Sequence, residues 1–238
     1  MQKPSKGLVI AIDGPAGSGK STVSKRIAKA LGILYIDTGA MYRALTLKAM
    51  RHHLDMNDAE RLTELARSAK IELEEEGGGL QVYLDGEDVS GLIRTPELTN
   101  NVKFIARVPG VRHEMVRLQR MAGELKSAVL EGRDIGTVVF PDADFKFYLD
   151  ASVEERANRR FKELISMGHK ADLGAIKEDI VIRDDSDMKR DVGALKKADD
   201  AIYIDTSKMT IDDVVNALIN RIQAQKINGR RLTINEKR

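Results

Sequence analysis

Cysteine is absent from the 238-residue sequence. Disulfide bonds, thiolate zinc sites and a cysteine nucleophile are therefore excluded, and the absence fits a reducing compartment. Long hydrophobic runs are missing too, since no segment approaches the roughly 18 apolar residues that a membrane-spanning helix needs. Residues 1–6 lead directly into a short apolar run and do not have the pattern of a signal peptide. We expect a cytoplasmic protein without a membrane partner.

The sequence also lacks a marked excess of charge of either sign. It contains 39 Lys and Arg residues and 37 Asp and Glu residues, which gives a formal net charge of +2. A long-range field that gathers nucleic acid needs a larger imbalance. We therefore expect no nucleic-acid partner, although binding through the polar, basic tail at residues 226–238 is a weaker alternative. Any strong anion site must be local.

Short apolar runs separated by helical patterns predict the fold class. The first run, Leu8 to Ile12, is unbroken and rich in β-branched residues, as expected for a strand buried on both faces of a parallel sheet. Similar runs follow at residues 33–36, 128–130, 145–149 and 201–204. Five strands that alternate with helices predict an α/β fold, in which a doubly wound five-stranded parallel sheet is flanked by helices.

An antiparallel element interrupts this alternation. Lys70 to Glu76 and Leu80 to Asp85 have the pattern of two strands, and three glycines join them. A helix of roughly residues 112–125 then leads back to the main sheet. We interpret the hairpin as part of a small inserted subdomain at about residues 65–105, within a single domain that spans residues 1–225.

The segment after the first strand carries the most specific motif. Residues 14–21 satisfy G-x-x-x-x-G-K-[ST] between a buried strand and a helix, which is the context that supports a phosphate-binding P-loop. Backbone N–H groups of such a loop surround phosphates, Lys20 reaches the β- and γ-phosphates of ATP, and the Ser21 hydroxyl ligates Mg²⁺. The predicted ATP-binding residues are Gly14, Pro15, Ala16, Gly17, Ser18, Gly19, Lys20, Ser21 and Thr22, with Ser21 as the metal ligand.

A P-loop alone leaves GTPases, ATP-driven motors, regulators and small-molecule kinases open. The sequence has no Asn-Lys-x-Asp guanine signature, and no hydrophobic strand ends in the paired Asp-Glu that a hydrolytic motor is expected to have. Both absences weaken the switch and motor interpretations.

Arginines in three later segments favour a kinase. An enzyme that phosphorylates a nucleotide must bring two polyanions together, and the planar fork of arginine suits this task. Arg43 follows the second strand, Arg133 follows the third, and Arg183, Asp187 and Arg190 fall at i, i+4 and i+7 on one predicted helical face. Taken alone, each segment also fits a capped helix start, a surface salt bridge or a solvated charge ladder.

The preceding helix adds further arginines, and the segment between the two helices looks flexible. Arg156, Arg159 and Arg160 fall at neighbouring helical spacings, and residues 168–173 follow them. We predict a mobile, Arg-rich lid at about residues 156–185 that closes over the triphosphate and excludes water.

Taken together, five segments give the sequence a family resemblance. They are IDGPAGSGKST, YIDTGAMYRA, DVSGLIRT, LEGRDIGTVVFPDA and IRDDSD, in that order. In this combination the sequence resembles the bacterial cytidylate kinases of the nucleoside monophosphate kinase superfamily. The resemblance implies an adenylate-kinase-like core, in which the inserted subdomain binds the acceptor and the lid is short.

The resemblance also implies the reaction and the residues that perform it. The γ-phosphoryl group of ATP would pass directly to CMP or dCMP, with Mg²⁺ as cofactor. Arg43 and Arg133 would bind the acceptor phosphate, Arg112 and Glu131 would lie near the cytosine, Arg183 and Asp187 at the ribose, and Arg190 between the two phosphates. The implied acceptor-binding residues are Thr38, Tyr42, Arg43, Arg112, Glu131, Arg133, Asp134, Arg183, Asp187 and Arg190, and the implied catalytic residues are Lys20, Arg133, Arg160 and Arg190.

Lys103 departs from the family, some members of which have Ser at this position. Two other functions stay open: a kinase for another pyrimidine monophosphate such as UMP, and a non-catalytic ATP-sensing module. The second is disfavoured because ATP binding alone gives the later arginines no use. We expect a monomer that acts on small nucleotides.

Overall fold

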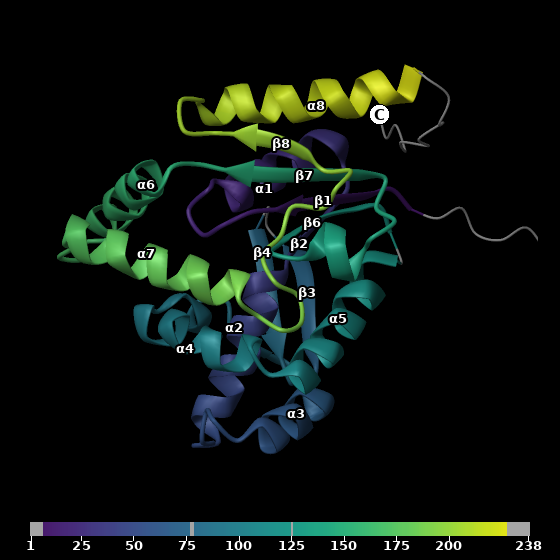
Figure 1. Cartoon of the computed structure of the whole chain (residues 1–238). Coiled ribbons are helices and arrows are strands. Elements are labelled where there is room, and N and C mark those ends of the chain that lie inside the picture. The colour runs from purple at the N-terminus through teal and green to yellow at the C-terminus, as the bar shows by residue number, and fades with distance from the viewer. Residues whose placement is uncertain (1–6, 77–78, 125, 228–238) are drawn as a thin grey trace, which may run out of the picture.

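The computed structural model describes residues 7–76, 79–124 and 126–227. Its main sheet has five parallel strands in the order β2-β6-β1-β7-β8 (Figure 1). These strands are β1 (Val9–Asp13), β2 (Leu34–Asp37), β6 (Ala128–Gly132), β7 (Phe145–Asp150) and β8 (Ile202–Asp205). The predicted α/β fold with a five-stranded parallel sheet is confirmed.

Helices cover both faces of this sheet because its strands are apolar on both sides. Ile10 and Ile12 of β1 belong to a core shared with α1 and α8, whereas Val9 and Ala11 belong to the core shared with α2 and α5. Successive strand residues face opposite sides, which explains the unbroken apolar run. The helices are α1 (Lys20–Leu31), α2 (Thr38–Arg51), α3 (Ala59–Ser68), α4 (Pro96–Ala106), α5 (Pro109–Glu124), α6 (Val153–Ser166), α7 (Leu173–Met188) and α8 (Ile211–Ile227).

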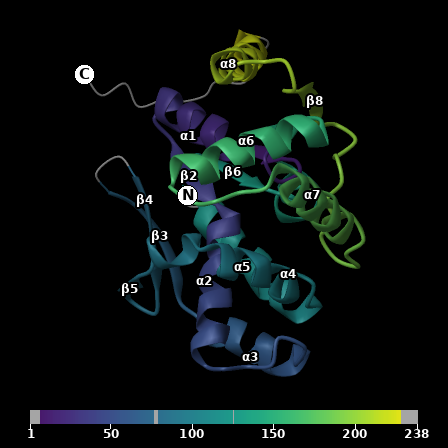
Figure 2. The same cartoon turned by 90° about the vertical axis from the view of Figure 1, so that its left-hand side faces the viewer.

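A second, smaller sheet confirms the predicted hairpin. The antiparallel strands β3 (Ile71–Glu76), β4 (Gly79–Leu84) and β5 (Glu87–Asp88) form it, and a short 3₁₀ turn, η1 (Leu92–Arg94), follows. Ile71, Val82 and Leu84 join the same core as α2. Figure 2 shows this sheet on one side of α2, with α7 on the other side.

Helices α6 and α7 pack side by side at one end of the main sheet (Figure 1). They have a small core of their own, which contains Ala157, Ile176 and Ile180. This core is separate from the two cores that cover the sheet.

Local signals set several helix ends. At the start of α6, Ser152 Oγ accepts a hydrogen bond from the Glu155 N–H at 3.2 Å, as the capping-box pattern predicts. The helix predicted from about residue 112 starts earlier, at Pro109, because proline favours the first turn of a helix. Residue 125, the predicted end of that helix, and residues 228–238 of the predicted tail lie outside the described residues. In the part of the chain described, no helix has the length and apolar character to cross a membrane.

Candidate active site

The P-loop makes a tight turn from β1 into α1. Gly14, Gly17 and Gly19 have φ values of 149°, 79° and 91°, which disfavour residues with a Cβ. At Gly14 a Cβ would lie 2.0 Å from the carbonyl oxygen of Leu149. Glycine at this position therefore allows the loop to turn directly against β7.

Lys20 folds back over this loop. Its Nζ donates to the Pro15 carbonyl oxygen at 2.6 Å and to Ser18 Oγ at 3.4 Å, and the residue is only 5% exposed. Burial, reinforced by repulsion from Arg133, lowers the pKa of Lys20 to about 7. A bound anion would favour the charged form of this amine.

Glu131 connects the P-loop to the second strand. Ser21 Oγ donates to Glu131 Oε2 at 2.9 Å, and the Tyr35 hydroxyl donates to the other carboxylate oxygen. Thr38 Oγ1 donates to the Glu131 carbonyl oxygen at 2.6 Å. Burial raises the pKa of the Glu131 carboxyl. These contacts place Glu131 beside the P-loop hydroxyl, and its implied position near the base stays a prediction.

The predicted helix start after β2 combines a cap with a cation. Asp37 Oδ1 accepts from the Ala40 N–H at 2.8 Å and caps α2, while Asp37 Oδ2 pairs with the Arg43 guanidinium at 3.0 Å. The ordinary N-cap interpretation is therefore correct for Asp37. Arg43 is not a free surface arginine, because it turns back to this strand end.

Asp187 holds two of the predicted arginines together. Arg133 Nε lies 2.7 Å from Asp187 Oδ2, and Arg190 pairs with Oδ1 of the same carboxylate. Burial alone would raise the pKa of Asp187, but Arg133, Arg190 and Arg183 hold it below its usual value. Burial and repulsion from Arg133 lower the pKa of Arg183 to about 10. A phosphate among these arginines would relieve their repulsion.

Arg112 and Asp134 form a deeply buried ion pair beside Tyr42. Arg112 is 2% exposed, and its guanidinium carbon lies 5.6 Å from the centre of the Tyr42 ring. The Tyr42 hydroxyl and the Nε atoms of Arg43 and Arg112 are buried without a hydrogen-bond partner among the described residues. Buried polar atoms are usually paired. These three atoms are therefore candidates for hydrogen bonds with a bound ligand.

Two arginines of the predicted lid lie near the P-loop: Arg156 contacts it directly, and Arg159 contacts Thr206, whose hydroxyl donates to the Ser18 carbonyl oxygen at 3.2 Å. Arg156 NH1 donates to the Ala16 carbonyl oxygen at 3.1 Å and pairs with Asp184 at 2.6 Å. Arg159 donates to the carbonyl oxygen and the hydroxyl of Thr206 at 2.7 and 3.1 Å. Sequence reasoning missed Thr206, which lies just after β8 and belongs to no motif.

Two predicted residues differ from their expected setting. Arg160 pairs with Glu163 at 2.7 Å on the exposed side of α6 and does not contact the loop, so its catalytic role stays a prediction. The single helical face predicted for residues 183–190 is wrong at its end, because α7 stops at Met188. Arg190 still reaches Asp187, but from the segment that follows the helix.

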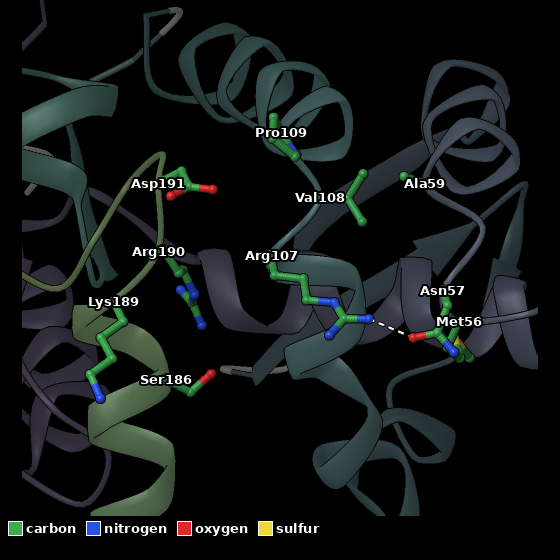
Figure 3. Close-up of a pocket in the computed structure, with 10 residues that line it drawn as sticks. All are labelled: Met56, Asn57, Ala59, Arg107, Val108, Pro109, Ser186, Lys189, Arg190 and Asp191. Atoms are coloured by element: carbon green, nitrogen blue, oxygen red, sulfur yellow. Dashed lines mark hydrogen bonds between the residues drawn. The ribbon is translucent and has the colours of Figure 1, made fainter.

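A cavity of about 410 Å³ opens beside Arg190 (Figure 3). Its volume is in the range of small-molecule sites. Arg107 and Lys189 add positive charge to its lining, and Arg107 also donates to Asn57 Oδ1 at 2.6 Å. The lining consists of Met56, Asn57, Ala59, Arg107, Val108, Pro109, Ser186, Lys189, Arg190 and Asp191. Sequence reasoning did not single out Arg107 or Lys189, because neither belongs to a motif.

Lys103 lies on the exposed side of α4. Its Nζ is 5.2 Å from the centre of the Phe104 ring. This contact turns the amine toward a neighbouring side chain of the same helix.

The buried pair of Arg112 and Asp134 predicts a large stability effect. Asp134→Ala leaves a buried guanidinium without its partner and is expected to lower the free energy of unfolding by about 3–5 kcal/mol. Glu163→Ala breaks the exposed pair with Arg160 and is expected to cost less than about 1 kcal/mol. Urea unfolding at pH 7 measures both values. Equal losses of unfolding free energy in Asp134→Ala and Glu163→Ala would contradict the buried ion pair.

A sequence profile described as cytidylate kinase matches residues 10–224. The chain belongs to the cytidylate kinase family. The cytidylate kinase of Desulforamulus reducens is 52% identical over 217 residues, covering 91% of this chain and 97% of that protein. The cytidylate kinase of Clostridioides difficile is 47% identical over 215 residues, covering 90% and 98%.

Family membership confirms the resemblance seen in the sequence and the prediction of an enzyme, a nucleoside monophosphate kinase with ATP as phosphoryl donor. It does not favour the non-catalytic ATP-sensing module. Among solved structures, an uncharacterized protein from Eubacterium ventriosum superposes with a TM-score of 0.51 at 13% identity, covering 91% of this chain and 99% of that one. At this identity the likeness shows the fold alone.

Proposed function

We propose that the chain transfers the γ-phosphoryl group of ATP to CMP and dCMP by direct in-line transfer. One observation carries the proposal: Ser21 of the P-loop lies 2.9 Å from Glu131, and Arg133, two residues further along the chain, shares the Asp187 carboxylate with Arg190. The P-loop and these arginines therefore lie close together, and cations gathered in this way repel each other unless anions lie among them. A donor triphosphate and an acceptor phosphate are such anions.

The donor end of the reaction belongs to the P-loop and the lid. Backbone N–H groups of the loop bind the phosphates of ATP, and Lys20 leaves its contact with Pro15 to neutralise the transferring group. Arg156 and Arg159 already lie against the loop region, which supports the proposed lid at about residues 156–185. Closure of this lid excludes water from the phosphoryl group.

The acceptor end belongs to the arginines that now pair with carboxylates. Arg43 and Arg133 exchange Asp37 and Asp187 for the phosphate of CMP, and Arg183 adds a third cation. Asp187 is then free to accept hydrogen bonds from ribose hydroxyls. The unpaired polar atoms around Tyr42 and Arg112 support a base-binding pocket there, bordered by Asp134, Thr38 and the subdomain at about residues 65–105.

The oxygen donors at the P-loop fit Mg²⁺. The Ser21 hydroxyl and the Glu131 carboxylate, 2.9 Å apart, are hard ligands of the kind this ion prefers. In the described residues, no three acidic or imidazole side chains form a metal-binding group. Ser21 would hold the ion, with Glu131 orienting its hydroxyl, and the bound ion supplies positive charge at the phosphates.

The reaction needs no strong general base from the protein. A phosphomonoester has a second pKa of about 6 and is largely ionised near neutral pH. Positioning and charge neutralisation therefore provide the catalysis. We further propose a monomer that acts on cytosolic nucleotides.

The acceptor preference tests this function directly. We expect rapid ATP-dependent ADP release with CMP, slower or similar release with dCMP, and poor release with AMP and GMP. A coupled assay across CMP, dCMP, UMP, AMP, GMP and shikimate measures these rates. Preference for UMP would favour the pyrimidine alternative, and equal or faster release with AMP or shikimate would contradict the proposal.

A further inference from the structure

Asp13 is a buried carboxylate that the proposed reaction does not use. It is the last residue of β1, directly before Gly14 of the P-loop, and it is 5% exposed. A buried charge is costly unless its hydrogen-bonding capacity is met. The partners of Asp13 therefore indicate what this side chain does.

Both carboxylate oxygens of Asp13 accept hydrogen bonds from backbone beyond β6. Oδ1 accepts from the Ile135 N–H at 2.8 Å, and Oδ2 accepts from the Gly136 N–H at 2.7 Å. These two residues begin the π-helical turn η2 (Ile135–Val139). A Cβ at Gly136 would lie 3.3 Å from Oδ2, closer than most such contacts, so glycine favours this approach.

The segment held by Asp13 carries two residues of the acceptor site. Arg133 and Asp134 are the only positions between Gly132, which ends β6, and Ile135. Asp13 is also the register partner of Gly132 in the pairing of β1 with β6. Strand pairing therefore fixes this segment at one end, and the Asp13 carboxylate fixes it at the other.

We infer that Asp13 is a positioning residue that fixes Arg133, and with it the acceptor phosphate, relative to the P-loop. This inference rests on the proposed kinase function. Asp13 leads directly into the loop that binds the donor, so one side chain connects the two phosphate sites. In-line transfer is sensitive to such placement, because a displacement of about 1 Å costs about 100-fold in rate.

The two hydrogen bonds are strongest with an ionised carboxylate, since a protonated carboxyl has reduced acceptor capacity. Charged and titratable groups face Asp13 from three elements: Lys20 on α1, Asp134 after β6 and Tyr148, its register partner on β7. Burial, with a further contribution from Asp134, raises the pKa of Asp13 to about 6 against the opposing effect of the two N–H donors and Lys20. The positioning contact is therefore complete only above about pH 6.

This titration has opposite effects on stability and on positioning. The folded protein binds the Asp13 proton more tightly than the unfolded chain, so this group makes the fold less stable as pH rises from 3.8 to about 6. Positioning improves as the folded protein loses this proton, around pH 6. An increase in activity as Asp13 loses its proton therefore cannot be explained by an increase in stability, because Asp13 makes the fold less stable as pH rises.

Asp13→Asn tests the inference because it keeps the shape but turns an NH₂ group toward one of the two N–H donors. We expect kcat for CMP to fall about 100-fold, while KM for ATP stays close to that of the wild type. Asp144→Asn is the matched control. Asp144 Oδ2 accepts from the Val9 N–H at 3.0 Å at the other end of β1, far along the strand from the phosphate sites. The Asp144→Asn variant is expected to keep a kcat near the wild-type value.

A second measurement needs no substrate. In the free wild-type protein, the amide resonances of Ile135 and Gly136 are expected to titrate with a midpoint at about pH 6, and in Asp13→Asn this titration is absent. The inference is overturned if Asp13→Asn keeps the wild-type kcat, or if both variants lose kcat in proportion to lost stability. A wild-type protein that phosphorylates no monophosphate would instead reject the proposed function, and the amide titration would still test the contact.

Discussion

Lys20→Ala is expected to lower kcat for CMP phosphorylation by about 1,000-fold. Lys20 is the buried P-loop amine that reaches the transferring phosphoryl group once ATP displaces its contact with Pro15. Its charge matters more in the transition state than in binding, so kcat falls more than KM for ATP rises. Initial rates over a range of ATP concentrations separate the two parameters.

The matched control is Lys29→Ala, which removes an exposed amine from the last turn of the same helix. We expect its kcat to be unchanged. Burial disfavours the charged form of Lys20, so removing this amine is expected to leave the melting temperature close to that of the wild type. A folded Lys20→Ala protein with near wild-type kcat would remove Lys20 from the mechanism.

Arg190→Ala is expected to lower kcat by about 100-fold. Arg190 shares the Asp187 carboxylate with Arg133, so its loss leaves Asp187 paired and the fold intact. The missing charge is the one proposed to lie between the two phosphates. Arg190→Lys is expected to restore only part of the rate, since an ammonium cannot form the bidentate contacts of a guanidinium.

Lys189→Ala serves as the control for this second prediction. Lys189 is adjacent in the sequence and lines the same cavity, but its side chain is 75% exposed and pairs with Asp185. Steady-state kinetics of the three variants decide the role of Arg190. Equal rates for Arg190→Ala and Lys189→Ala would show that this cavity wall contributes only a diffuse charge.

Features that depend on neighbouring residues in the sequence were predictable. The apolar run of β1, the P-loop and the capping box at Ser152 each depend on a local pattern, and the structure contains the strand, the turn and the cap. Asp37 caps α2, as the alternative interpretation of a capped helix start allowed. The third strand of the small sheet, Glu87–Asp88, was missed because two residues show no periodicity.

Features that depend on distant partners were not predictable. Helical spacing makes Arg156, Arg159 and Arg160 neighbours, but it does not show that the first two find partners at Ala16 and Thr206 and that the third pairs with Glu163 on its own helix. Asp13 was overlooked for the same reason. Its partners, Ile135 and Gly136, are more than a hundred residues away, and nothing near Asp13 in the sequence indicates them.

The fate of the γ-phosphoryl group is the most direct test of the central claim. With γ-³²P-labelled ATP, CMP and Mg²⁺, the label is expected to appear in CDP as fast as ADP forms, and Lys20→Ala is expected to abolish most of this transfer. Thin-layer chromatography of the products distinguishes CDP from inorganic phosphate. Label that accumulates in inorganic phosphate while CMP is unchanged would contradict the proposed phosphoryl transfer.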